Sequence, residues 1–340
     1  MSRCRSLRGL WLGAFAVSTA HVALFACVSE PERAAHVPSE ASRHAPLTPP
    51  LMPPTRVVAA APVNPAPVPA SADPALAFDP PAVLRLPETL QPGERVPLLL
   101  VLHGFGVSSG LLIAKAGLNR VADQRKFAYL APEGARDAQG RPFWNSGKSC
   151  CDLEHQQTED VRRLRELLAA NLTHASIDPK RVFVIGYSNG GFMAQRLACD
   201  IGDRIAGVVS VAGAAPSPDV PCVQSSPLAV LEIHGDADPV VHYQGGTVFD
   251  RTDVEAHVSA LDTVKYWAQR LSCRGPLREV NRLDLEPNVP ERETLVQSFA
   301  DCRGAVELWT VRGGGHYVAL QPPALDAIWS FVQAHPKGGA

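Results

Sequence analysis

The sequence predicts an α/β fold: a doubly wound, mostly parallel sheet with helices on both of its faces. From Val83 onward, short and nearly continuous apolar runs alternate with amphipathic stretches. Such runs are typical of strands that are buried on both faces, as in parallel sheets. Strands that alternate with helices over about 250 residues indicate repeated βαβ units. We therefore expect one domain over residues 83–340.

Six apolar runs are the predicted strands of this sheet: Val96–Leu102, Phe127–Leu130, Val182–Ile185, Gly207–Val211, Leu228–Ile233 and Val306–Val311. Four stretches have the apolar spacing of helices, at residues 161–172, 190–199, 254–271 and 322–333. The first of these follows Thr158, Glu159 and Asp160, which suit a helix cap and an acidic first turn. Strands and helices therefore alternate along most of the domain.

The first 82 residues differ in composition from the rest. Between Pro31 and Pro81 lie 14 of the 31 prolines, together with 12 alanines. A segment with so few large apolar residues cannot bury enough surface to offset the entropy of ordering. We therefore expect residues 27–82 to form a disordered, Pro/Ala-rich tether.

Residues 1–26 have the pattern of a secretory signal peptide. Arg3, Arg5 and Arg8 precede an uncharged run that ends at Ala26. The segment Leu-Phe-Ala-Cys that ends at Cys27 resembles the bacterial lipobox, in which the cysteine is acylated. This resemblance implies an outer-membrane lipoprotein, facing the periplasm or the cell surface, with its lipid anchor on Cys27. An ordinary secreted protein is the alternative.

The charge and the metal-binding motifs limit the partners of the chain. The formal net charge is -2, which gives no electrostatic reason to bind nucleic acid. The sequence contains no His-Glu-x-x-His, no pair of Cys-x-x-Cys motifs and no EF-hand spacing. Neither a nucleic-acid partner nor a catalytic metal is therefore expected.

Ser188 is the candidate nucleophile. It is the serine of a Gly-x-Ser-x-Gly pattern between a predicted strand and a predicted helix. A nucleophile elbow needs such a tight turn, with small residues where backbone segments approach closely. The helix that follows also directs its positive end toward Ser188, where negative charge develops. A glycine-rich turn with an idle serine is the alternative.

Two further loops supply a candidate base and a candidate acid, because a serine needs a base and a group that orients it. His316 follows three glycines after the last predicted strand and is the candidate base. Asp238 ends a His-Gly-x-x-Asp segment after the preceding predicted strand and is the candidate acid. Asp236, in the same loop, is the alternative acid and is expected to cap the turn.

Four other histidines and one tryptophan have less specific settings. His103 and His234, each followed by glycine at a strand end, are expected to bond to the backbone. His242 and His257 are expected on the surface. Trp144 suits either the core or the rim of a pocket.

An oxyanion hole is expected from two backbone N–H groups. One belongs to the residue after the nucleophile and the other to a loop after an early strand. Asn189 and Phe105 hold these positions, the latter in His-Gly-Phe-Gly.

Several motifs together resemble one family of secreted esterases, which are similar to polyhydroxybutyrate depolymerases and feruloyl esterases. They are Leu-His103-Gly, Phe-Trp144-Asn with Cys150-Cys151, Gly-Tyr-Ser188-Asn-Gly-Gly-Phe-Met, Leu-Ala-Cys199, Ile-His-Gly-Asp-Ala-Asp238-Pro and Gly-Gly-Gly-His316. The resemblance implies an α/β-hydrolase fold and hydrolysis of carboxylic esters through an acyl-enzyme, without a cofactor. Polyesters and esterified polysaccharides are the implied substrates.

The resemblance also implies disulfides Cys273–Cys302 and Cys199–Cys222, as an exported chain favours bridges. The adjacent Cys150 and Cys151 are left open: they bridge each other, pair elsewhere or remain thiols.

Two other functions share these features. A serine peptidase of the prolyl oligopeptidase type has the same triad. A non-catalytic lipoprotein that binds an envelope polymer could have the same fold, but a degraded triad would be expected there, and all three members are present here.

Overall fold

The computed structural model describes residues 76–217, 220–222, 226–286, 289–318 and 322–338, and all structural statements refer to these ranges. The predicted signal peptide, Cys27 and most of the predicted tether lie outside them. No helix in these ranges is both long and apolar enough to cross a membrane.

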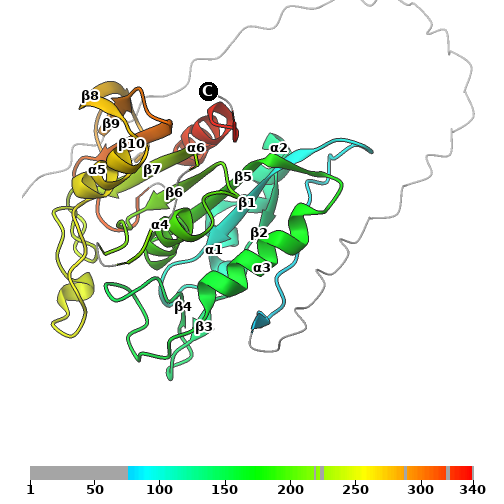
Figure 1. The fold of residues 1–340 in the computed structure, drawn as a ribbon, viewed down its shortest axis with the longest axis horizontal. Coiled ribbons are helices and arrows are strands. Elements are labelled where there is room, and N and C mark those ends of the chain that lie inside the picture. The colour runs from blue at the N-terminus through cyan, green and yellow to red at the C-terminus, as the bar shows by residue number, and fades with distance from the viewer. Residues whose placement is uncertain (1–75, 218–219, 223–225, 287–288, 319–321, 339–340) are drawn as a thin grey trace, which may run out of the picture. The chain divides into compact units, whose positions relative to one another are not determined.

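An eight-stranded sheet organises the described part of the chain, in the order β2-β1-β5-β6-β7-β10-β9-β8 (Figure 1). The strands from β2 to β10 in this order run parallel, whereas β9 and β8 are antiparallel additions at one edge. Their bounds are β1 Val96–Leu102, β2 Ala128–Leu130, β5 Ile177–Tyr187, β6 Gly207–Val211, β7 Leu228–Gly235, β8 Arg274–Leu283, β9 Thr294–Ala300 and β10 Gly304–Val311. A short separate pair joins β3 (Ala135–Arg136) to β4 (Pro142–Phe143).

Helices cover both faces of the sheet (Figure 1), so the predicted doubly wound α/β fold is confirmed. One apolar cluster joins the sheet to α3, α4 and α5, and a second joins it to α1, α2 and α6. The helices are α1 Ser109–Ala116, α2 Leu118–Arg125, α3 Asp160–Leu172, α4 Asn189–Asp200, α5 Ala260–Arg270 and α6 Pro322–Ala334, with a short 3-10 turn at Val248–Asp250.

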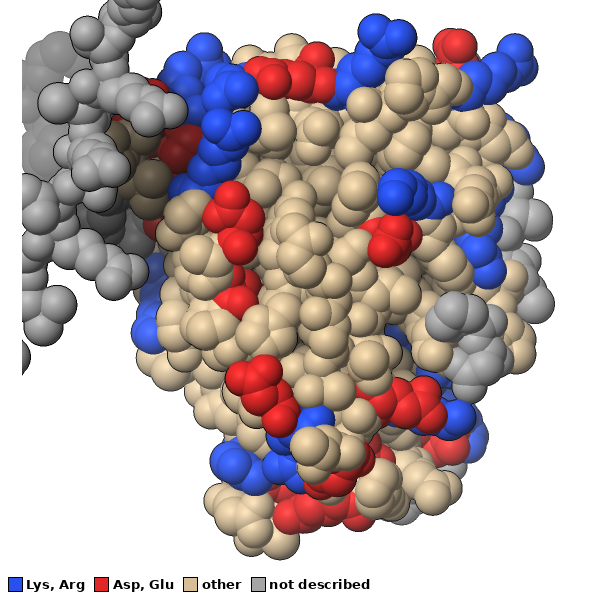
Figure 2. Space-filling view, turned by 90° about the vertical axis from the view of Figure 1, so that its left-hand side faces the viewer, with Lys and Arg blue, Asp and Glu red and all other residues tan. Residues whose placement is uncertain are grey.

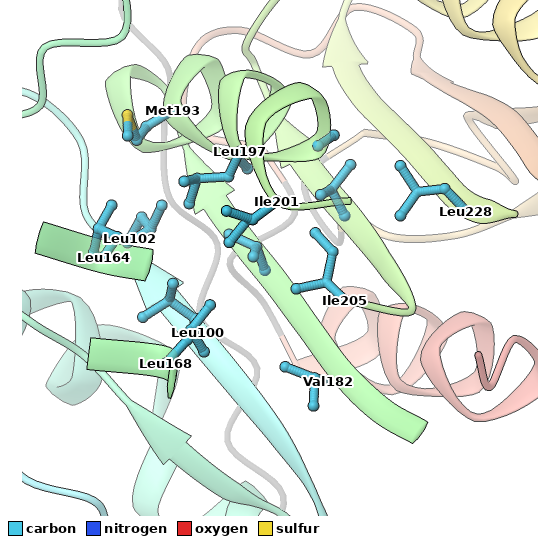
Figure 3. Packing of buried hydrophobic residues seen from close by; sticks show 14 of the residues in the cluster. Leu100, Leu102, Leu164, Leu168, Val182, Met193, Leu197, Ile201, Ile205 and Leu228 are labelled. Carbon is cyan, nitrogen blue, oxygen red and sulfur yellow. The ribbon is translucent and has the colours of Figure 1, made fainter. Parts of the chain in front are cut away.

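The apolar run of β1 shows how both faces are filled. Leu100 and Leu102 lie in the cluster with α3 and α4, whereas Leu99 and Val101 lie in the other cluster. In Figure 3, Met193 and Leu197 of α4 lie near the side chains of β1. Burial of each such side chain contributes about 1.5–3 kcal/mol to the stability of the fold. This packing holds α4, and with it Ser188 at its start, against the sheet.

Residues just before Val83 pack against the domain. Leu76, Phe78 and Ala82 are at most 9% exposed and pack at the edge of the domain. The Arg163 guanidinium lies 4.3 Å from the ring centre of Phe78 and donates a hydrogen bond to the Ala77 carbonyl (2.9 Å). The last residues of the predicted tether therefore pack against the domain, through a few apolar side chains and the contacts of Arg163.

Several further elements differ from the prediction. The helix expected over residues 254–271 starts at Ala260, and the preceding Val254 and Val258 pack beside the candidate site instead. Strands β8 and β9 were not predicted. Most of β8 is exposed, so it lacks the apolar run by which the other strands are recognised.

Three disulfides cross-link the domain. Cys199–Cys222 and Cys273–Cys302 are the two pairs that the resemblance implied. Cys150 and Cys151 are bridged to each other, which is one of the alternatives left open above.

Charges of both signs interleave on the face of the molecule in Figure 2, and uncharged residues cover most of it. Among the residues coloured there, no broad basic patch of the kind that phosphate backbones require is present.

Candidate active site

Ser188 lies in the tight turn between β5 and α4. Its backbone has φ 54° and ψ -120°, a conformation that is unusual for a residue other than glycine and typical of a strained functional turn. Its N–H donates to the Val211 carbonyl at the end of β6 (2.7 Å). A Cβ atom on Gly190 would press into the carbonyl oxygens of Leu102 and His103, so only glycine fits there.

The structure brings Ser188, His316 and Asp238 into one hydrogen-bonded line. The Ser188 hydroxyl donates to His316 Nε2 (2.9 Å), and His316 Nδ1 donates to Asp238 Oδ2 (2.7 Å). The three residues are 4–8% exposed. They meet because they follow β5, β7 and β10, parallel strands whose carboxyl ends share one edge of the sheet.

The loop of His316 is held by Tyr187, the residue before Ser188. The Tyr187 hydroxyl donates to the His316 carbonyl oxygen (3.0 Å), and the Tyr187 and His316 ring centres are 5.4 Å apart. The contacts of Tyr187 with His316 therefore help to fix His316 beside Ser188, in addition to the hydrogen bond between Ser188 and His316.

The two carboxylates of the acid loop have different partners. Asp238 faces His316, whereas Asp236 is exposed and accepts a hydrogen bond from the Gly313 N–H (2.6 Å). Asp236 thus ties its loop to the glycine loop that carries His316, and it does not contact the imidazole.

Asp238 is held as a carboxylate. Burial alone would raise its pKa, but the hydrogen bonds from His234 and His316 outweigh burial and hold the pKa of Asp238 well below its usual range. Its Oδ1 also accepts from the N–H groups of Val240 (2.7 Å) and Val241 (2.9 Å). An ionised Asp238 can stabilise a positive charge on His316.

The backbone N–H groups of Phe105 and Asn189 make no hydrogen bond within the described part of the chain. Trp144 joins the segments that carry them. Its indole N–H donates to the His103 carbonyl (3.0 Å), and its backbone N–H and C=O bond to the amide side chain of Asn189 (2.7 and 2.9 Å). Trp144 is fully buried, so it belongs to the core rather than to a pocket rim.

Sequence reasoning missed an apolar cluster beside these residues. It contains the Cys150–Cys151 disulfide and is completed by Phe192, Ala214, Val241 and Val248, with Phe105, Val240, Val254 and Val258 packed against it. The Asn189 side-chain amide lies 3.5 Å from Cys150 Sγ, which places the disulfide next to the nucleophile turn. Two adjacent cysteines were the only signal for this cluster.

The disulfide also lines a cavity of about 510 Å³. Most other lining side chains are polar or charged: Asn145, Lys148, Asp152, His155, Gln157, Asp253 and Glu255. Lys148 and Glu255 pair across it (3.3 Å). The wall of the cavity therefore combines hydrogen-bonding side chains with the disulfide.

A family model described as phospholipase/carboxylesterase matches residues 89–264, just over half of the chain. The chain belongs to this family. The matched residues include Ser188 and Asp238, and His316 follows outside them.

Similar curated proteins carry esterase names. This carboxylesterase-family chain is 33% identical to "Putative esterase NocK" of Nocardia uniformis subsp. tsuyamanensis, over 66% of this chain and 65% of the other. It is 28% identical to feruloyl esterase B of Piromyces equi, over 69% of this chain and 42% of the other. It is 32% identical to a poly(3-hydroxybutyrate) depolymerase of Ralstonia pickettii, over 37% of this chain and 27% of the other. The chain thus spans less than two thirds of these relatives.

An acetyl xylan esterase from Aspergillus awamori has a similar solved structure. The TM-score is 0.53 at 15% identity, over 74% of this carboxylesterase-family chain and 94% of the other. At this identity the likeness shows the shared α/β-hydrolase fold alone.

The remaining histidines of this carboxylesterase-family chain differ in their settings. His103 donates from Nδ1 to the Gly104 carbonyl (2.9 Å) and accepts from the Gly134 N–H (2.9 Å), and burial lowers its pKa, so it is neutral. His242 is half-buried beside Asp250 (2.7 Å). The surface prediction for His257 is wrong: it is 5% exposed and packs edge-on against Phe192. In the described ranges, no three His, Cys, Asp or Glu side chains form a group that could hold a metal ion.

Proposed function

We propose that this chain is a serine carboxylesterase that hydrolyses carboxylic esters through an acyl-enzyme. The observation that carries the proposal is the line of hydrogen bonds from Ser188 through His316 to Asp238, in a chain of the carboxylesterase family. The strained backbone of Ser188 and the unbonded amides beside it support the same function.

Each group has one role in this reaction. Ser188 Oγ attacks the ester carbonyl carbon while His316 Nε2 takes the hydroxyl proton, and Asp238 stabilises the imidazolium that forms. The N–H groups of Phe105 and Asn189 donate to the oxyanion. His316 then gives its proton to the departing alkoxide, which leaves as the alcohol. A water molecule releases the acid by the same steps in reverse.

We propose esters of hydroxyl-rich alcohols, such as esterified polysaccharides, as the substrate class. The cavity lined by the disulfide carries amide and carboxylate side chains, which suit hydroxyl groups. Cys150, which lines it, lies 3.5 Å from the side-chain amide of Asn189, the residue after Ser188. The names of feruloyl esterase B and of the structurally similar acetyl xylan esterase agree with this class. The name of the Ralstonia pickettii relative makes a polyester the alternative.

Labelling and a substrate panel test the proposal. A fluorophosphonate should attach to the purified full chain at Ser188, as read by mass spectrometry of the peptide, and hydrolysis of p-nitrophenyl acetate should fall in proportion. We expect feruloyl or acetyl esters of xylan to be cleaved with a higher kcat/KM than oligomers of 3-hydroxybutyrate. An unlabelled Ser188 in a chain that still hydrolyses esters would exclude the mechanism, and the reverse order of substrates would favour the polyester.

We also propose that the chain is exported and anchored to the outer membrane through a lipid on Cys27. The signal-peptide pattern of residues 1–26 and the lipobox-like segment before Cys27 support this. The three disulfides of the described domain suit an oxidising compartment outside the cytosol.

Mass spectrometry of the mature protein from its native host tests the anchor. We expect a chain that begins at Cys27 and carries acyl groups, and a Cys27→Ser variant should appear in the soluble fraction. A mature chain without acyl groups would make the protein freely secreted instead.

A further inference from the structure

A second imidazole, in addition to that of His316, lies beside the carboxylate of Asp238. His234, at the end of β7, is 1% exposed, and its Nε2 lies 3.5 Å from Asp238 Oδ2, the same oxygen that accepts from His316. The serine esterase mechanism proposed above does not use His234.

Both ring nitrogens of His234 face acceptors. Nε2 lies 2.8 Å from the carbonyl oxygen of Val241, which can only accept, so Nε2 carries a hydrogen. Nδ1 lies 3.2 Å from Glu232 Oε1. Glu232 also accepts from the side-chain amide of Gln195 (3.0 Å) and from the Gly213 N–H (3.2 Å). Burial raises the pKa of Glu232, and its hydrogen bonds with His234 and Gln195 oppose that rise. A His234 imidazolium would donate to Glu232 and to Val241 at once.

The charges around His234 agree with this state. Burial by itself lowers its pKa, but the two carboxylates beside the ring, Asp238 and Glu232, outweigh burial and raise the pKa of His234 to about 9. The other titratable groups near the ring are His316 beyond Asp238, Tyr243, whose ring lies edge-on at 5.7 Å, and His257. Tyr243 donates to or accepts from Thr310 (2.7 Å) and leaves both nitrogens of His234 to the oxygens.

Glu232 and His234 are linked to α4, the helix that follows Ser188. Gln195, which holds Glu232, belongs to α4 and accepts from the indole N–H of Trp267 in α5 (2.5 Å). Gln195 and Glu232 are fully buried. Burying an ion pair is costly, and apolar residues of the same volume are often as stable. A role in the reaction would explain why charges occupy this position.

We propose that His234, held as an imidazolium by Glu232, is a positioning residue that keeps Asp238 ionised and aligned on His316. The proposal rests on the proposed function. The positive charge of His234 favours the ionised form of Asp238. Without it, the Asp238 carboxylate should be less firmly ionised and less well aligned on His316.

Steady-state kinetics test this in His234→Gln and in the double variant Glu232→Gln/His234→Gln. In both, kcat should fall about tenfold with KM unchanged, because His234 does not touch the ester. Tyr243→Phe, which keeps the ring beside His234 and its charge, should leave kcat unchanged.

The double variant removes the Glu232 carboxylate together with His234, so Glu232 is not left buried without its cation, which protects the test against unfolding of the single variant. In the unaltered enzyme, side-chain ¹⁵N NMR should find both nitrogens of His234 protonated at pH 7. An unchanged kcat in the folded variants, or a neutral His234 ring at pH 7, would overturn the proposal. The NMR result does not depend on turnover, so it separates this proposal from a failure of the esterase assignment.

Discussion

Ser188→Ala is expected to lower kcat for a short p-nitrophenyl ester by about 10⁵- to 10⁶-fold, because the alanine has no oxygen that can form the acyl-enzyme. The residual rate should come from the N–H groups of Phe105 and Asn189 and from binding alone. Steady-state kinetics of the purified variant would measure the loss.

The fold should survive this change. Ser188 is 7% exposed, and its backbone N–H, which bonds to Val211, remains in the variant. Thermal unfolding should therefore show a Tm close to that of the unaltered chain. Ser330→Ala, on the exposed side of α6, is the matched control and should keep full activity. Equal rates for Ser188→Ala and the unaltered chain would exclude Ser188 as the nucleophile.

Asp238→Asn is expected to lower kcat by about 10⁴-fold. An asparagine in this position can turn its amide N–H toward His316 Nδ1, which then becomes an acceptor and leaves the hydrogen on Nε2. In that tautomer His316 Nε2 cannot take the proton of Ser188. The asparagine also lacks the negative charge that stabilises the imidazolium in the transition state.

Asp236→Asn is the matched control for the acid. Asp236 lies two residues away in the same loop, and an asparagine oxygen can still accept from the Gly313 N–H. We expect its kcat to remain within a few-fold of the unaltered value, since surface substitutions away from such a network have small effects. A large loss in Asp236→Asn with a small loss in Asp238→Asn would assign the acid to Asp236 instead.

The alternation of strands and helices was readable because it depends on local patterns. Each predicted strand is a nearly continuous apolar run, and each run lies almost entirely within a strand of the sheet, although β5 is longer than its run at both ends. The exposed strand β8 has no such run, because it pairs with β9 at the edge of the sheet and buries little. Its existence depends on a hydrogen-bonding partner rather than on its own side chains.

The nucleophile turn was readable for a similar reason. Gly186, Ser188 and Gly190 lie within five residues, and the need for glycine arises from close approach of backbone segments around one turn. Trp144 had no comparable signal. Its bonds to His103 and Asn189 join residues 41 and 45 positions away, and no pattern around Trp144 encodes them.

The sequence by itself determined the α/β class, the strand–turn–helix around Ser188 and the loops in which an acid and a base were to be sought. Only the tertiary structure decided that Asp238 rather than Asp236 faces His316, that His257 is buried, and that His234 and Glu232 stand behind the acid. The physical reason is the range of the interactions. Periodicity and turn chemistry act between residues a few positions apart, whereas His316 meets Asp238 and Ser188 across separations of 78 and 128 residues. Such contacts exist only once the parallel strands have brought their carboxyl ends to one edge of the sheet.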